Sequence, residues 1–361
     1  MTVSCPKPDA RFHKARPSHT AAEARGPQSI LNWMRTPDCA ATAVWRCTAR
    51  LLTTLALASL VISACASSPP PQEARPPSTP VAVTPLSKGY LGRPVVQVSV
   101  NGQGPFDFLL DTAATTTAIF KNLQAALDVD TEPVRQIRVF SLSDIESKPV
   151  ARLDTLSIGG LSFNEIDAVI FDDWGGQTPT PAGIIGLDIL TDYFPVIDPV
   201  NGHLSLYAKD TPPWELIANW DKSEMYTDSF GFAGLSLYLL EARIGYKRFP
   251  LLLDTGASIS IGNVALVSYL PTFPRRELPS GETTLSGAND IETIVMLLRA
   301  TNARTGGISW EDVEFYISRA SIFEELGFAS EPIGILGYQE FSERGFALDF
   351  ENNQFYRAPK R

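Results

Sequence analysis

The chain has 361 residues, 44% hydrophobic and 10% aromatic, which is enough for two modest hydrophobic cores. Residues 66–361 carry 37 acidic and 22 basic side chains, a net charge of −15. This excess of negative charge argues against binding to nucleic acid and against electrostatic binding to anionic lipid. All four cysteines lie in residues 1–65 and the chain has three histidines, so the remainder has no disulfide or thiol nucleophile, and a histidine-rich metal site is excluded.

The N-terminal residues 1–65 have the composition of a basic extension followed by a signal peptide. Residues 51–64 (LLTTLALASLVISA) are uncharged, and fourteen residues fit the apolar region of a signal peptide better than a membrane span. The tetrapeptide Ile62-Ser63-Ala64-Cys65 resembles the lipobox of bacterial lipoproteins, which implies cleavage before Cys65 and a lipid on its sulfur. We therefore expect a protein tethered to the bacterial cell envelope that faces the periplasm or the exterior. An ordinary signal peptide or an uncleaved anchor is the alternative, and translation could start at Met1 or at Met34.

A spacer and two similar halves follow. Residues 66–87 are rich in proline, serine and alanine, which predicts an extended spacer. The same markers then recur in the same order in residues 88–208 and 229–361, with a linker at 209–228, so we infer an internal duplication. The paired markers are Asn101-Gly102 with Ile244-Gly245, residues 144–146 with 290–292, residues 159–163 with 306–310, and Asp198 and Asn201 with Asp349 and Asn352.

Each half contains β-branched and aromatic runs separated by glycines, and only short stretches compatible with a helix, such as residues 121–127. This pattern predicts an all-β fold. Several residues have ordinary structural roles in this interpretation: Asp198 and Asp349 support turns, residues 310–314 form a solvated strand edge, and Tyr338 and Phe341 lie in the core.

Both halves contain an apolar strand that ends in an aspartate, in residues 108–115 (FLLDTAAT) and 251–258 (LLLDTGAS). One aspartate at a strand end is ordinary turn chemistry, but duplicated halves can bring two together. Adjacent carboxylates cannot both ionise cheaply, so Asp111 and Asp254 would share a proton. One could take a proton from water while the other donates to a carbonyl oxygen, which is amide hydrolysis without a covalent intermediate.

The two motifs resemble the Asp-Thr-Gly signature of aspartic proteases. Ile184-Ile185-Gly186 and Ile335-Leu336-Gly337 resemble the apolar-apolar-glycine element of the same proteins, and the length of the halves is closer to retropepsins than to pepsin. The resemblance covers about residues 88–361. It implies two β-barrel-like lobes related by a pseudo-twofold axis with the active-site cleft between them. It also implies a monomer with an internal pseudo-dimer, an extended peptide or protein substrate, and neither metal nor organic cofactor.

The resemblance also assigns roles to individual residues. They are the catalytic pair Asp111 and Asp254, the active-site turns (Thr112, Ala113, Thr255, Gly256), the strands passing the aspartates (Gly186, Gly337) and the flap hairpins over the substrate (Ser141, Ser143, Ser286, Gly287).

One position departs from the pattern, because Ala113 stands where a glycine is expected. Its methyl group would strain the turn if φ were positive there, or would crowd the substrate. Two alternatives follow. The chain could be a catalytically inactive peptide-binding lipoprotein on the same fold, or a structural envelope protein whose two Asp-Thr turns are coincidental.

Overall fold

Strands make up most of the described chain, which confirms the prediction of a mostly β protein. The structure, a computed structural model, describes residues 78–129, 131–140, 145–173, 180–230, 236–270, 284–286 and 291–360, which all belong to one compact unit. Cys65 and the flap residues Ser141, Ser143 and Gly287 lie outside this set, and Ser286 is described by its backbone alone. Among the described residues, no helix has the length and apolar character needed to cross a bilayer.

The described residues of the first half form ten strands and three short helical segments. The strands are β1 (Ala82–Lys88), β2 (Pro94–Val100), β3 (Gln103–Leu110), β4 (Ala118–Phe120), β5 (Thr131–Phe140), β6 (Ile145–Ile158), β7 (Leu161–Phe171), β8 (Gly183–Ile185), β9 (Tyr193–Asp198) and β10 (His203–Ala208). The helical segments are η1 (Tyr90–Gly92), α1 (Lys121–Leu127) and α2 (Leu187–Leu190), and α1 coincides with the stretch that the sequence marked as compatible with a helix.

The described residues of the second half form a similar order of elements, again with ten strands. These are β11 (Asp221–Asp228), β12 (Leu237–Ile244), β13 (Lys247–Asp254), β14 (Ser260–Asn263), β15 (Thr284–Ser286), β16 (Ile291–Thr305), β17 (Ile308–Ser318), β18 (Gly334–Gly337), β19 (Phe346–Asp349) and β20 (Gln354–Arg357). The helical segments are α3 (Trp214–Ile217), η2 (Val264–Ser268), α4 (Ile322–Glu325) and η3 (Tyr338–Glu340).

The same chain of strand pairings surrounds each Asp-Thr turn. In the first half β3 runs parallel to β8, β8 antiparallel to β4, and β4 parallel to β7. In the second half β13 runs parallel to β18, β18 antiparallel to β14, and β14 parallel to β17. The last apolar residues of β3 and β13 are buried because each strand is flanked on both edges, so each aspartate emerges at the end of a rigid element.

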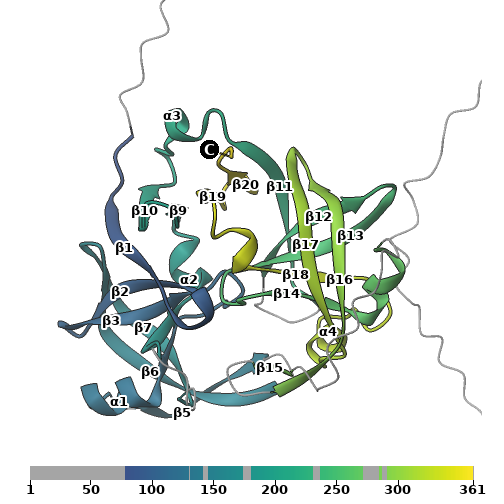
Figure 1. The fold of residues 1–361 in the computed structure, drawn as a ribbon. Coiled ribbons are helices and arrows are strands. Elements are labelled where there is room, and N and C mark those ends of the chain that lie inside the picture. The colour runs from purple at the N-terminus through teal and green to yellow at the C-terminus, as the bar shows by residue number, and fades with distance from the viewer. Residues whose placement is uncertain are drawn as a thin grey trace, which may run out of the picture. The chain divides into compact units, whose positions relative to one another are not determined.

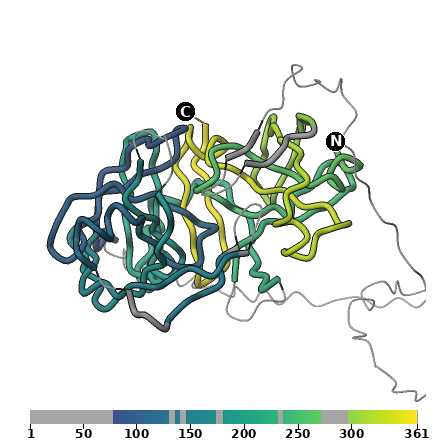
Figure 2. Tube along the Cα trace, turned by 90° about the horizontal axis from the view of Figure 1, so that it is seen from below, coloured from purple at the N-terminus to yellow at the C-terminus, as the bar shows by residue number. Residues whose placement is uncertain are grey.

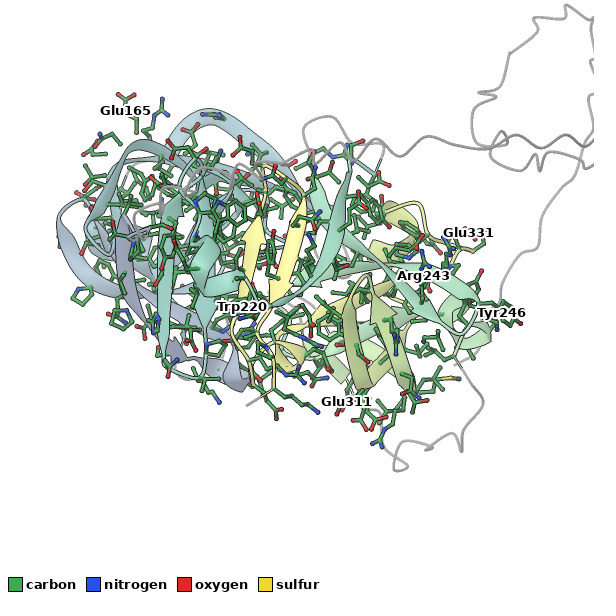
Figure 3. The ribbon with its side chains drawn as sticks, turned by 90° about the horizontal axis from the view of Figure 1, so that it is seen from above. Glu165, Trp220, Arg243, Tyr246, Glu311 and Glu331 are labelled. Carbon is green, nitrogen blue, oxygen red and sulfur yellow. The ribbon has the colours of Figure 1, made fainter. Side chains whose placement is uncertain are left out.

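Six antiparallel strands form one sheet to which both halves contribute, in the order β1, β10, β9, β19, β20, β11. Figure 1 draws β9 and β10 beside β19 and β20, and Figure 2 shows the yellow β19–β20 segment between the blue first half and the green part of the second. At the seam Ile197 pairs with Phe346. Phe194, Tyr356 and Trp220 pack on this sheet, and Trp220 lies near the middle of the view in Figure 3.

The strands β1 and β11 correct two predicted boundaries. Residues 82–87 were predicted as spacer and residues 209–228 as linker, but β1 pairs first with β10 and then with β2, and β11 pairs first with β20 and then with β12. The proline-containing composition of β1 is tolerated because β1 lies at the edge of the six-stranded sheet, where a missing N–H need not break a ladder.

The structural roles predicted for single residues are mostly confirmed. Asp198 and Asp349 each accept a hydrogen bond from the backbone N–H of the asparagine three residues later, at 2.9 Å in both turns. Tyr338 and Phe341 are buried. The prediction of a solvated edge at Trp310 is wrong, because this side chain is 2% exposed and packs on Phe355. Trp310 occupies the buried face of β17, whereas the adjacent Glu311 and Asp312 are exposed.

Candidate active site

Two threonines hold the Asp-Thr turns of the two halves together. The backbone N–H of Thr112 donates to Oγ1 of Thr255 at 3.1 Å, and the N–H of Thr255 donates to Oγ1 of Thr112 at 3.1 Å. The hydroxyl of Thr112 in turn donates to the carbonyl oxygen of Leu253 at 2.9 Å, and that of Thr255 to the carbonyl oxygen of Leu110 at 2.7 Å. Both threonines are buried, so these four reciprocal bonds fix the turns against each other.

The backbone of each turn orients its own carboxylate. Oδ1 of Asp111 accepts the N–H groups of Ala113 at 2.8 Å and Ala114 at 3.0 Å. Oδ1 of Asp254 accepts the N–H of Ala257 at 2.8 Å. One oxygen of each side chain is therefore fixed by its own turn, and both carboxylates keep some exposure to solvent although protein atoms surround them.

The surroundings keep at least one of the two aspartates protonated near neutral pH. Burial and, after it, the negative charge of Asp111 together raise the pKa of Asp254 to about 8, against the opposing N–H groups of Ala257 and Gly256. Burial also raises the pKa of Asp111, while the N–H groups of Ala113 and Ala114 lower it. Two carboxylates that influence each other in this way titrate as a pair and hold one proton over a wide pH range.

Three glycines allow the close approach of backbone to the site. A Cβ on Gly256 would lie 2.2 Å from Oδ2 of Asp111, so only glycine lets this turn contact the opposite carboxylate. A Cβ on Gly186 would lie 2.8 Å from the carbonyl oxygen of Ala114, and one on Gly337 would lie 2.3 Å from that of Ile259. A side chain at Gly186 or Gly337 would therefore meet backbone of the segments that follow the aspartates.

Ala113 occupies the place that Gly256 has in the other turn, and its backbone is unstrained. Neither residue has a positive φ, so the turn itself does not require glycine at this position. The methyl group packs partly buried against the core. The strain considered for Ala113 in the sequence is therefore absent.

Two residues near the site were not identified from the sequence. The positive charge of Arg93 acts on both Asp111 and Asp254 and offsets part of the rise in their pKa values. Burial lowers the pKa of Arg93 itself. Asp188, at the start of α2, accepts the N–H and the hydroxyl of Thr117 at 2.8 and 2.9 Å. The hairpin turn at residues 101–102 could not have identified Arg93, because the β2–β3 register shifts between Val98 and Val100.

Hairpins occur where the two flaps were predicted. β5 pairs antiparallel with β6 up to Phe140 opposite Ile145, and β15 pairs with β16 from Ser286 opposite Ile291. In Figure 1 both hairpins lie below β14 and β18. The tips with Ser141, Ser143 and Gly287 lie outside the described residues, so their role remains a prediction.

Comparison with known proteins supports the same chemistry. Residues 96–189 match the family model of aspartyl proteases. The match includes Asp111 and Gly186 and ends before Asp254, so it covers the turn in which alanine replaces glycine. No curated protein matches the chain. In the described part of the chain, no cluster of three or more His, Cys, Asp or Glu side chains could hold a metal ion.

Proposed function

We propose that this protein is an aspartic endopeptidase that hydrolyses peptide bonds with water activated between Asp111 and Asp254. The observation that carries the proposal is the set of reciprocal bonds of Thr112 and Thr255, which joins the two Asp-Thr turns and so supports a common site for both aspartates. Turns that resembled each other by coincidence would have no reason to meet in this way. The match of residues 96–189 to aspartyl proteases supports the same reaction.

The roles of the two carboxylates follow from their surroundings. With a pKa of about 8, Asp254 holds the proton of the pair at neutral pH and donates it to the carbonyl oxygen of the substrate. Asp111, stabilised as an anion by two N–H groups and by Arg93, takes a proton from the attacking water. No covalent intermediate forms, and collapse of the tetrahedral species returns a proton to the leaving amine.

The fold proposed for this function is a pair of β-barrel-like lobes related by a pseudo-twofold axis, in one chain that acts as a monomer. The repeated pairings around β3 and β13 and the seam between β9 and β19 support it. The substrate would be an extended peptide or an unfolded protein segment held beneath the two hairpins. Sedimentation equilibrium should give the mass of a single chain.

The proposed location is the bacterial cell envelope, with a lipid on Cys65. The lipobox-like sequence supports it, and the substrates would then be envelope proteins within reach of the tether. Cys65→Ser should abolish incorporation of labelled fatty acid and release the protein from the membrane fraction.

The deciding experiment measures cleavage of an unfolded protein substrate by the wild-type chain and by Asp111→Asn and Asp254→Asn. We expect cleavage by the wild type and a loss of about 10⁴-fold or more in each variant, because each carboxylate takes part in the same step. The control is Asp154→Asn, an exposed aspartate of β6, which should retain full activity. Equal activity in all four proteins would refute the assignment.

A catalytically inactive peptide-binding protein is the other outcome of the same experiment. It would show tight peptide binding by the wild type without any cleavage product, and Ala113→Gly would then create turnover. The negative φ of Ala113 argues for the active enzyme.

A further inference from the structure

Arg93 and Asp111 lie just beyond the adjacent ends of two paired strands, Arg93 before β2 and Asp111 after β3. In the β2–β3 ladder Val95 pairs with Leu109, so continuing this antiparallel register by two residues sets Arg93 opposite Asp111. Residues two apart lie on the same face of a strand, and directly opposite residues have Cα atoms about 5 Å apart. The backbone therefore brings Arg93 to the end of the strand where Asp111 emerges.

The matched position in the second half carries a leucine. In the β12–β13 ladder Leu239 pairs with Leu252, so the same extension sets Leu237 opposite Asp254. Leu237 is 8% exposed and belongs to the core. Two halves with the same pairings thus differ at this position: the register sets an arginine opposite one aspartate and a buried leucine opposite the other.

The guanidinium of Arg93 is held in place by the loop that precedes β2. Its Nε donates to the carbonyl oxygen of Tyr90 at 3.2 Å, and its Cζ lies 5.8 Å from the centre of the Tyr90 ring. The N–H of Gly89 donates to the carbonyl oxygen of Arg93 at 2.8 Å and closes the loop. Arg93 remains partly exposed, so a ligand bound at the aspartates can reach it.

Other enclosed basic groups do not share this setting. Arg357 is 4% exposed, lies 4.1 Å from the centre of the Trp310 ring and donates to the carbonyl oxygen of Ser309. Lys148 is ion-paired with Asp172 at 3.0 Å. The contacts of Arg357 and Lys148 stabilise the fold of one half each. The charge of Arg93, in contrast, acts on both aspartates of the site.

We propose that Arg93 is a specificity-determining residue that binds an acidic side chain of the substrate, close to the scissile bond and on one side of it only. The inference rests on the peptidase function proposed above. A guanidinium and a carboxylate form paired, charge-assisted hydrogen bonds, and a partly desolvated site strengthens them. Because Leu237 stands at the matched position, the mirror-related subsite should favour an apolar side chain.

The test compares peptides that carry a single glutamate, glutamine or lysine at each position around one cleavable bond. For the wild type we expect kcat/KM to be about 10-fold higher for glutamate than for glutamine at one position, as one charge-assisted hydrogen bond provides. Arg93→Gln should reduce this ratio to about one, and Arg93→Lys should keep part of it. Arg93→Glu should favour the lysine peptide at the same position. Ratios within one enzyme cancel any general change in activity.

Arg243→Gln is the matched control, because Arg243 lies on β12, the strand that corresponds to β2, and bonds to Glu241. It pairs with Arg248, six residues from Asp254 and thus about 20 Å along the strand. Figure 3 shows Arg243 near Tyr246, on the same side of the second half. The preference of Arg243→Gln for the glutamate peptide over the glutamine peptide should equal that of the wild type. Thermal unfolding of each variant checks that the fold is intact.

Binding separates this inference from the proposed function. Calorimetric titration of the same peptides into full-length Asp254→Asn, with and without Arg93→Gln, measures the preference without turnover. If no peptide is cleaved but glutamate binding depends on Arg93, the peptidase proposal fails and Arg93 keeps its assignment. If the glutamate preference is absent in the wild type, or survives in Arg93→Gln, the role of Arg93 is refuted even though peptides are cleaved.

Discussion

Replacing Asp254 by asparagine should stabilise the fold in a pH-dependent way while abolishing activity. Asparagine keeps an oxygen that can accept the N–H of Ala257 but has no proton to lose. Folding raises the pKa of Asp254 from 3.8 to about 8, so the folded state binds the proton more tightly than the unfolded chain. The associated stability is fully present below about pH 4 and is lost as the pH rises through 8. The loss amounts to on the order of 5 kcal/mol.

Differential scanning calorimetry between pH 4 and pH 9 measures this effect. Since 1 kcal/mol shifts the Tm of a large domain by about 2 °C, the Tm of Asp254→Asn should gain about 10 °C on that of the wild type between pH 4 and pH 9. Asp154→Asn, the exposed control, should follow the wild type throughout. A Tm difference between Asp254→Asn and the wild type that is independent of pH would show that Asp254 does not carry the shared proton.

Three further predictions concern the same site. Above pH 8, kcat/KM should fall about tenfold per pH unit as Asp254 loses its proton, and a profile that is flat to pH 10 would contradict this. Gly256→Ala should lower kcat by about 100-fold or more, because the added Cβ would lie 2.2 Å from Oδ2 of Asp111. Ala113→Gly should change kcat by less than about 10-fold. If both variants change kcat to a similar extent in stopped assays, the two turns do not differ in their need for glycine. Thr255→Val should lower the free energy of unfolding in urea by about 3 kcal/mol, because the N–H of Thr112 and the carbonyl oxygen of Leu110 would each lose a buried hydrogen bond. A decrease below about 1 kcal/mol would mean that the reciprocal bonds contribute little to stability.

The paired aspartates could be predicted from the sequence because the residues next to each of them in the chain form a recognisable motif. Each follows an apolar strand and precedes a threonine, and the order of markers recurs in both halves. The threonine bonds and the close approach at Gly256 then agree with what such turns require. Local patterns also sufficed for the helix at residues 121–127 and for the turn supports Asp198 and Asp349.

Features that depend on pairing between distant strands were missed. The strand β1 has the composition of a spacer, and only its partners β10 and β2 make it a strand. Trp310 is followed by Glu311 and Asp312 in sequence, yet its side chain lies on the buried face of β17. Arg93 has no repeated counterpart that would mark it, and its relation to Asp111 appears once the register of β2 and β3 is known.

Both carboxylates belong to a single polypeptide, so a substitution beside one of them is made once. In a symmetric homodimer every change at the catalytic centre appears twice, and a methyl group tolerated on one side must also be tolerated on the other. Here Ala113 coexists with Gly256, whose replacement would collide with Asp111. Joining the halves in one chain therefore permits directional peptide binding. The residues that contact the N-terminal side of a cleaved bond can change independently of those that contact its C-terminal side.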